Sequence, residues 1–150
     1  MFHEEFLAFL DALNQAAVKY ILVGEYSVIL HGYSRSTGDM DLWVMPDSDN
    51  YAKLKLAFNI FQMPVFDMTQ DKFLDTNYDV FTFGRPPLSI DIMTSVKGLY
   101  FEETYINSEI HTFENIPIRV IHLNHLRKAK EASNRPKDQD DLLNLPDLTL

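Results

Sequence analysis

The chain has 150 residues, of which 46% are hydrophobic, and carries a net charge of −9. This length predicts a single domain over residues 1–150, with enough apolar side chains for a full core. The 22 acidic residues outnumber the 13 basic ones, which argues against long duplex DNA, a ligand held mainly through Lys and Arg. The absence of cysteine excludes disulfides and thiolate metal sites. The chain shows no signal-peptide pattern or membrane-length apolar run, so we expect a cytoplasmic protein that does not contact a membrane.

Hydrophobic spacing in the first part of the chain predicts helices alternating with short strands. Phe6, Leu10, Leu13 and Ala17 recur at helical intervals. The elements expected next are a buried strand at 20–23 ending at Gly24, a helix at 25–31, a strand at 39–44, and a helix after a cap at Ser48.

The second part predicts a pair of strands, a short helix, another pair of strands and a helical end. These elements are expected at 79–83, 88–93, 99–105, near Ile110, at 118–121, and in two helices that begin near Asn124 and Pro136. The order predicts an α/β (α+β) fold, a mixed sheet of about five strands with helices packed mostly on one face.

Asp39 and Asp41 are the first candidate site residues. They lie two positions apart on a predicted strand, so their side chains point to the same face, about 7 Å apart at the backbone. Carboxylates placed in this way can converge on a pair of divalent metal ions, the arrangement that phosphoryl transfer uses. The alternative is that an Asp-x-Asp sequence marks only a solvated strand end.

Asp91 is the candidate for a third carboxylate. It alternates with the apolar residues Ile90 and Ile92, so it faces away from the core side of its predicted strand. There it would complete a metal shell or accept a proton from an attacking hydroxyl. The alternative is an ordinary exposed strand residue.

Gly24, Ser27 and Arg35 are candidates for nucleotide binding. Gly24 lies between a predicted strand and a predicted helix, where free backbone amides can meet a phosphate. Ser27 could add a hydroxyl, and Arg35 lies just before the Asp39–Asp41 pair, near enough to meet a phosphate. Arg35 could instead form a surface ion pair with Asp39 or Asp41.

These motifs together resemble the nucleotidyltransferase superfamily, whose members include DNA polymerase β. The resemblance rests on Gly24, on Asp39-Met40-Asp41, and on the later strand with Asp91. The run from His31 to Asp41 is similar to the Arg-x-Thr-x-Asp-x-Asp pattern of a small bacterial subgroup, which contains abortive-infection-type and lincosamide nucleotidyltransferases. The tail from Leu126 to Leu142 resembles the closing helices of that subgroup.

The resemblance implies a nucleotidyltransferase fold and transfer of a nucleoside monophosphate from a nucleoside triphosphate, such as ATP, to a hydroxyl. The cofactor would be Mg²⁺ or Mn²⁺ held by Asp39, Asp41 and Asp91, and Gly24, Ser27 and Arg35 would contact the nucleotide. The acceptor would be a protein, an RNA end or a small molecule. The alternative is a non-catalytic or antitoxin-like subunit that retains the fold and partners a helical protein.

Glu25 departs from the family pattern, which has a small Gly or Ser at this position. A carboxylate beside a triphosphate repels it, so we expect Glu25 to turn away from the phosphates, to join the metal shell or to be screened by the metal. The basic residues of the tail, Lys130, Arg135 and Lys137, are interpreted as solvated or paired with nearby acids, with phosphate binding by a lysine as the alternative.

Overall fold

The computed structural model describes residues 2–85 and 87–147. Its helices are α1 (Glu4–Gln15), α2 (Gly24–Leu30), α3 (Ser48–Phe61), α4 (Gln70–Leu74), α5 (Phe101–Ile106), α6 (Leu123–Ser133) and α7 (Pro136–Asn144). Its strands are β1 (Tyr20–Val23), β2 (Asp39–Val44), β3 (Val80–Phe83), β4 (Ser89–Met93), β5 (Glu109–Phe113) and β6 (Ile116–Val120).

The strands form one mixed six-stranded sheet in the order β3-β4-β2-β1-β6-β5. Strand β2 is central, antiparallel to β1 and parallel to β4. Both edges of the sheet are antiparallel pairs, β3 with β4 and β5 with β6. The parallel pairing of β2 and β4 matters for the site, because it places Asp41 directly beside Asp91.

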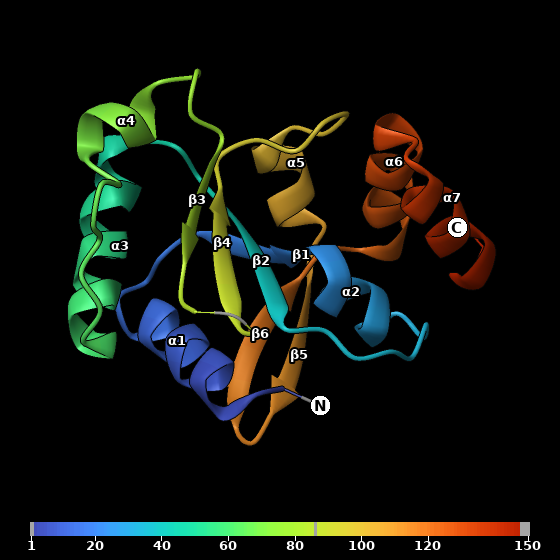
Figure 1. Cartoon of the computed structure of the whole chain (residues 1–150), viewed down its shortest axis with the longest axis horizontal. Coiled ribbons are helices and arrows are strands. Elements are labelled where there is room, and N and C mark those ends of the chain that lie inside the picture. Colours follow the sequence, from blue (N-terminus) through green and yellow to red (C-terminus); the bar gives the residue numbers. More distant parts are fainter. Residues whose placement is uncertain (1, 86, 148–150) are drawn as a thin grey trace.

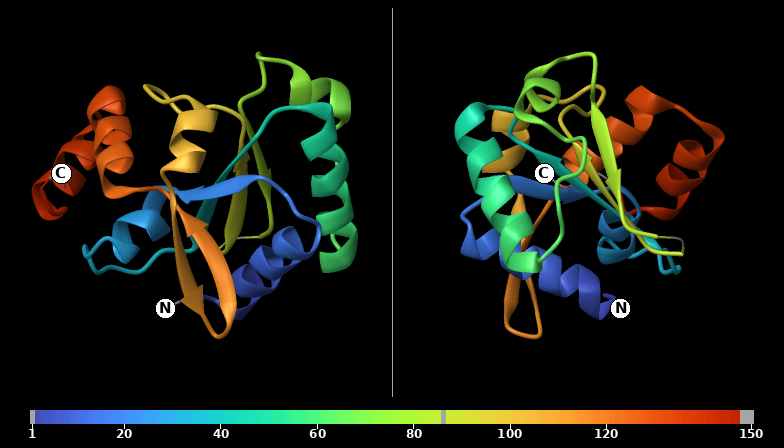
Figure 2. Two further views of the ribbon diagram at one scale, coloured as in Figure 1. Left: turned by 180° about the vertical axis from the view of Figure 1, so that it is seen from behind. Right: turned by 60° about the vertical axis from the view of Figure 1, so that its left-hand side comes forward.

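Helices cover both faces of the sheet (Figures 1 and 2). On one face, α1, α3 and α4 pack against inward residues of the strands, such as Met40, Leu42 and Ile92. On the other face, α5 and α6 pack against a second apolar cluster that includes Trp43 and Val23. Successive strand residues alternate between these faces, so Asp41 lies on the α5–α6 face with Trp43.

The sequence predicted the α/β class and most elements, and the structure corrects several details. The sheet has six strands instead of about five, and its helices lie on both faces instead of mostly on one. The short helix α4 was not expected. The cap of α3 is Asp47, one residue before the predicted Ser48, and the cap of α6 is His122, two residues before Asn124. In both cases the side chain accepts a hydrogen bond from a free backbone amide of the first turn.

Within residues 2–85 and 87–147, no helix combines the length and the apolar character needed to cross a membrane.

Candidate functional site

Asp41 and Asp91 lie side by side at the centre of the sheet. They are register partners on the parallel strands β2 and β4, and Asp91 is among the groups that raise the pKa of Asp41. Sequence reasoning placed them on one face from strand alternation alone, and the pairing of β2 with β4 brings them into contact. Two adjacent carboxyl groups of this kind form a strong acceptor for a proton or a cation.

Gly24 is required by the position of the Asp41 side chain. It opens α2 with a φ of +66°, and a Cβ built on it would lie 2.0 Å from Oδ2 of Asp41. Any larger residue would therefore displace the carboxylate. Gly24 contributes by giving Asp41 room, which is a different role from the backbone phosphate contact expected from the sequence.

Asp39 lies at the outer edge of the acidic group. It is exposed, and its register partner on β4 is Ser89. The hydroxyl of Ser89 donates to Oδ1 of Asp39 at 2.7 Å, and the backbone amide of Asp39 donates to Thr37 Oγ1 at 3.1 Å. Its charge still reaches Asp41, because it is one of the groups that raise the pKa of that residue.

Electrostatic repulsion is concentrated on Asp41. Burial, the hydrogen bond with Asp91, and the negative charges of Asp91, Asp39 and Glu25 together raise the pKa of Asp41 to about 7. The folded protein therefore holds a proton in the Asp41–Asp91 pair under conditions where an ordinary carboxyl group is ionised. A divalent cation placed there would remove the same repulsion.

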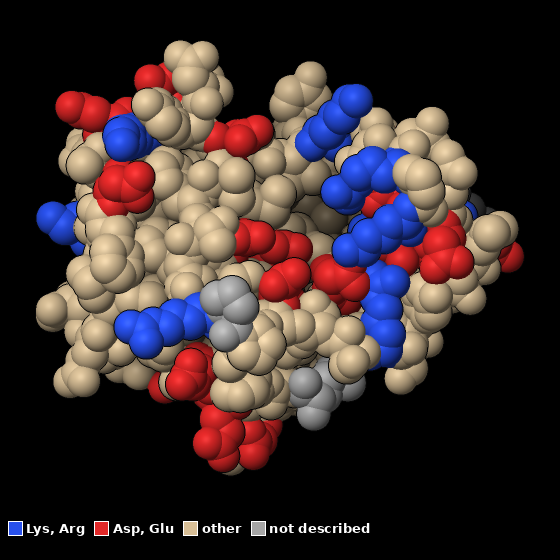
Figure 3. Space-filling model, viewed as in Figure 1, with Lys and Arg blue, Asp and Glu red and all other residues tan. Residues whose placement is uncertain are grey.

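A cavity of about 330 Å³ opens over the carboxylate pair. One side is formed by Gly24, Asp41 and Asp91, and the other by the end of α6 and the start of α7, including Lys130 and Arg135. On the surface, acidic side chains gather at the centre of this face, with Lys and Arg side chains beside them around a hollow (Figure 3). Carboxylates and cations therefore face each other across one space.

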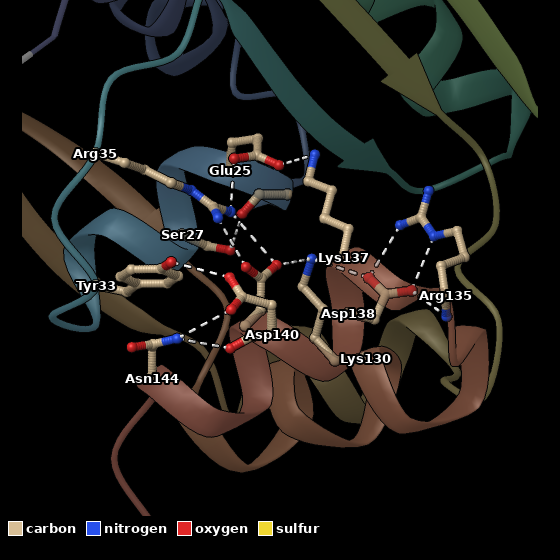
Figure 4. Close-up of polar contacts among 12 residues, drawn as sticks. Glu25, Ser27, Tyr33, Arg35, Lys130, Arg135, Lys137, Asp138, Asp140 and Asn144 are labelled. Carbon is tan, nitrogen blue, oxygen red and sulfur yellow. Dashed lines mark hydrogen bonds and ion pairs between the residues drawn. The ribbon is translucent and has the colours of Figure 1, made fainter.

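Arg35 does not contact the Asp39–Asp41 pair that the sequence offered as its alternative partner. Its guanidinium lies 2.6 Å from Oε2 of Glu25 and 2.7 Å from Oδ1 of Asp141. Glu25 also contacts the ammonium group of Lys137 (Figure 4). Glu25 is thus paired with two cations, one from the loop after α2 and one from α7, an arrangement that the sequence did not predict.

A buried ionic cluster holds α7 against α6 (Figure 4). Asp138 and Asp141 are fully buried, and Lys130 of α6 lies 3.3 Å and 2.9 Å from their carboxylate oxygens. Burial alone would raise the pKa of Asp138, but hydrogen bonds from Arg135 and the charge of Lys130 lower it to about 2. The tail interpretation of Lys130 and Arg135 as paired with nearby acids is confirmed.

Ser27, a nucleotide-binding candidate, and Trp43, a neighbour of the carboxylates on β2, are both buried in the structure. Ser27 is fully buried, and its hydroxyl donates to the carbonyl oxygen of Gly24 at 2.6 Å. That bond shapes the turn into α2. Trp43, on the carboxylate face, is 2% exposed and packs edge-on against Phe101 of α5.

The donor chemistry of the pair fits a divalent metal, which prefers carboxylate oxygens. Within the described ranges, no three or more His, Asp or Glu side chains are grouped so that they could hold a metal ion together. Mg²⁺ is often held by one or two carboxylates together with substrate phosphates and water. Asp41 and Asp91 fit that smaller ligand set, with Asp39 beside it.

Sequence reasoning missed two hydroxyl residues at the site. Thr82 on β3 is the register partner of Asp91, and its hydroxyl donates to Oδ1 of Asp91 at 2.6 Å. Ser89 stands in the same relation to Asp39. A signal was present for Thr82, because it alternates with the apolar residues Phe81 and Phe83 and so shares the face of the carboxylates.

Comparison with models of known protein families finds no match to this chain, and comparison with curated proteins finds none either.

Replacing Gly24 with Ala should destabilise the fold by about 2–4 kcal/mol, because the new Cβ is strained at positive φ and overlaps Asp41. Gly32→Ala is the matched control, since Gly32 has a φ of +116° but nothing within 4 Å of its Cβ position. That control should lose about 1–2 kcal/mol from strain alone. Urea unfolding measures both, and equal losses would contradict the close packing of Gly24 on Asp41.

The Asp41→Asn variant should gain stability over the wild type as pH rises. The folded pKa of Asp41 is about 7, above its unfolded value of 3.8, so the folded state binds more protons between these pH values. The free energy of unfolding of metal-free wild type therefore loses this contribution as pH rises towards and past 7. We expect Asp41→Asn to equal wild type near pH 5 and to exceed it by about 1–2 kcal/mol at pH 8. Urea unfolding with EDTA present tests this, and a difference independent of pH would contradict it.

Proposed function

We propose that this protein is a metal-dependent nucleotidyltransferase, which moves a nucleoside monophosphate from a nucleoside triphosphate to a hydroxyl group. The observation that carries the proposal is the Asp41–Asp91 pair beneath a cavity whose opposite side bears Lys130 and Arg135. Carboxylates suit a divalent cation and basic side chains suit phosphate oxygens. The two kinds of group face a common space of about 330 Å³, within the range of small-ligand sites.

In this reaction the acceptor oxygen bonds to the α-phosphorus, the bond from that phosphorus to the bridging oxygen breaks, and pyrophosphate leaves. Asp41 and Asp91 would hold Mg²⁺ or Mn²⁺, with Asp39 nearby on the same strand as Asp41. The bound ion supplies a Lewis acid that stabilises charge on the phosphoryl oxygens. The hydroxyl proton would pass to a carboxylate oxygen of the acidic group that does not hold the ion.

Buried aspartates hold the two cations that line the cavity, Lys130 and Arg135, in fixed positions. Lys130 is 9% exposed by side chain and is fixed by Asp138 and Asp141. Arg135 is held by Asp138 at 2.8 Å but has a 65% exposed side chain, so part of its guanidinium can meet a phosphate. A cation held in place in this way loses little side-chain entropy when it binds.

Glu25 is a negative charge close to Asp41, and two cations pair with it. Its carboxylate contacts Arg35 and Lys137, so those two cations are not directed at the cavity. We assign Arg35 to holding α2 to α7 through Glu25 and Asp141, with its charge acting on phosphate only at longer range. Gly24 and Ser27 contribute to nucleotide binding through the turn that places Asp41.

Binding and transfer should both depend on the carboxylate pair. Wild type should bind a non-hydrolysable triphosphate in Mg²⁺ by isothermal calorimetry, and should transfer α-³²P label from at least one nucleoside triphosphate to protein, RNA or small-molecule acceptors. Asp41→Asn and Asp91→Asn should each lower transfer by more than about 100-fold, because a ligand of the metal is lost. Asp49→Asn, the same change on an exposed residue of α3, should leave both unchanged.

A wild type that binds no triphosphate with any divalent cation would contradict the proposal. That result would favour the alternative, a non-catalytic or antitoxin-like subunit that retains the fold and partners a helical protein. Equal transfer by Asp41→Asn and wild type would also contradict it.

A further inference from the structure

Two hydroxyl side chains from neighbouring strands hold the outer carboxylates of the site. Thr82 on β3 contacts Asp91, and Ser89 on β4 contacts Asp39. Neither residue belongs to the motifs that carry the family resemblance, and neither is part of the buried core. Their contacts therefore call for a reason at the site itself.

Strand register produces both contacts. Thr82 lies directly opposite Asp91 in the antiparallel β3–β4 pair, and Ser89 lies directly beside Asp39 in the parallel β2–β4 pair. Cross-strand partners project from the same face of a sheet with their Cβ atoms about 5 Å apart. Each hydroxyl thus reaches its carboxylate without displacement of the backbone.

Both hydrogen bonds are short. Thr82 Oγ1 lies 2.6 Å from Oδ1 of Asp91, and Ser89 Oγ lies 2.7 Å from Oδ1 of Asp39. Both lengths lie in the range of well-formed hydroxyl hydrogen bonds. Each bond occupies one carboxylate oxygen, Oδ1, and restricts rotation of the group, so that Oδ2 has a defined direction.

We propose that Thr82 and Ser89 are positioning residues, which orient Asp91 and Asp39 to receive a divalent cation. This inference rests on the proposed function, since it concerns the same site. Outer hydrogen bonds that orient metal ligands typically contribute 10–100-fold to metal affinity. Thr82 is the stronger case, because Asp91 lines the cavity beside Asp41, whereas Asp39 is exposed and does not line it.

Thr82 is suited to a clean substitution. It is exposed on the edge strand β3, and Val has the same shape and a high preference for strands. Thr82→Val therefore removes the hydroxyl with little effect on folding, and Thr82→Ser restores it. Thr112→Val is the matched control, because Thr112 is an exposed residue of the other edge strand, β5.

The test is Mn²⁺ binding by the full chain without nucleotide, measured by electron paramagnetic resonance of the free ion. Thr82→Val should weaken binding roughly ten-fold, Thr82→Ser and Thr112→Val should bind as wild type does, and Ser89→Ala should show a smaller loss than Thr82→Val. Melting curves in EDTA check that each variant is folded.

The outcomes separate this inference from the proposed function. If wild type binds Mn²⁺ and Thr82→Val binds equally well, the positioning role is wrong and the metal site stands. Equal weakening in Thr82→Val and Thr82→Ser would assign the effect to packing and would also overturn the inference. If wild type binds no Mn²⁺ either alone or with a non-hydrolysable triphosphate, both the inference and the proposed metal site are wrong.

Discussion

The repulsion between Asp41 and its acidic neighbours is the constraint on which the rest of this site depends. Asp41 is placed by β2 beside Asp91 on β4, and Gly24 leaves it the space to stay there. Burial and the surrounding negative charges raise the pKa of Asp41 to about 7. A fold gains nothing in stability from such a pair, and strained or repulsive groups are concentrated at functional sites. The pair is therefore the candidate site for a positive ligand.

Across the cavity from Asp41, the buried carboxylates of α7 are neutralised by cations. Asp138 and Asp141 are fully buried, and each is paired with cations from α6 or the segment before α7. Arg35 adds a tie from the loop after α2 to Asp141. Breaking one partner of a buried pair is costly, so this cluster fixes α7 relative to α6 and α2. The cationic side of the cavity is thereby held at a constant position above the carboxylates.

The sequence predicted those features that follow from local periodicity. Alternation along the strands placed Asp39 and Asp41 on one face, and isolated Asp91 between Ile90 and Ile92, as the register shows. The turn at Gly24 was also evident, although its physical reason, contact with Asp41, depends on a strand met later in the chain. The α/β class and most elements followed in the same way.

Features set by tertiary pairing could not be predicted from the sequence. The sequence did not show that α5 and α6 pack on the second face of the sheet, because the spacing of apolar residues along a helix does not say which sheet face the helix covers. Arg35 precedes the two aspartates in the chain but pairs with Glu25 and Asp141, because α7 packs beside α2. The hydroxyl of Thr82 has meaning only once β3 is paired with β4.

The most direct measurement is a crystal structure of the wild-type protein grown with Mn²⁺ and a non-hydrolysable nucleoside triphosphate, with anomalous diffraction used to locate the metal. We expect an anomalous peak within about 2.0–2.4 Å of oxygens from both Asp41 and Asp91, with the triphosphate between that peak and Lys130. A nucleotide bound elsewhere, or metal that contacts neither carboxylate, would contradict it.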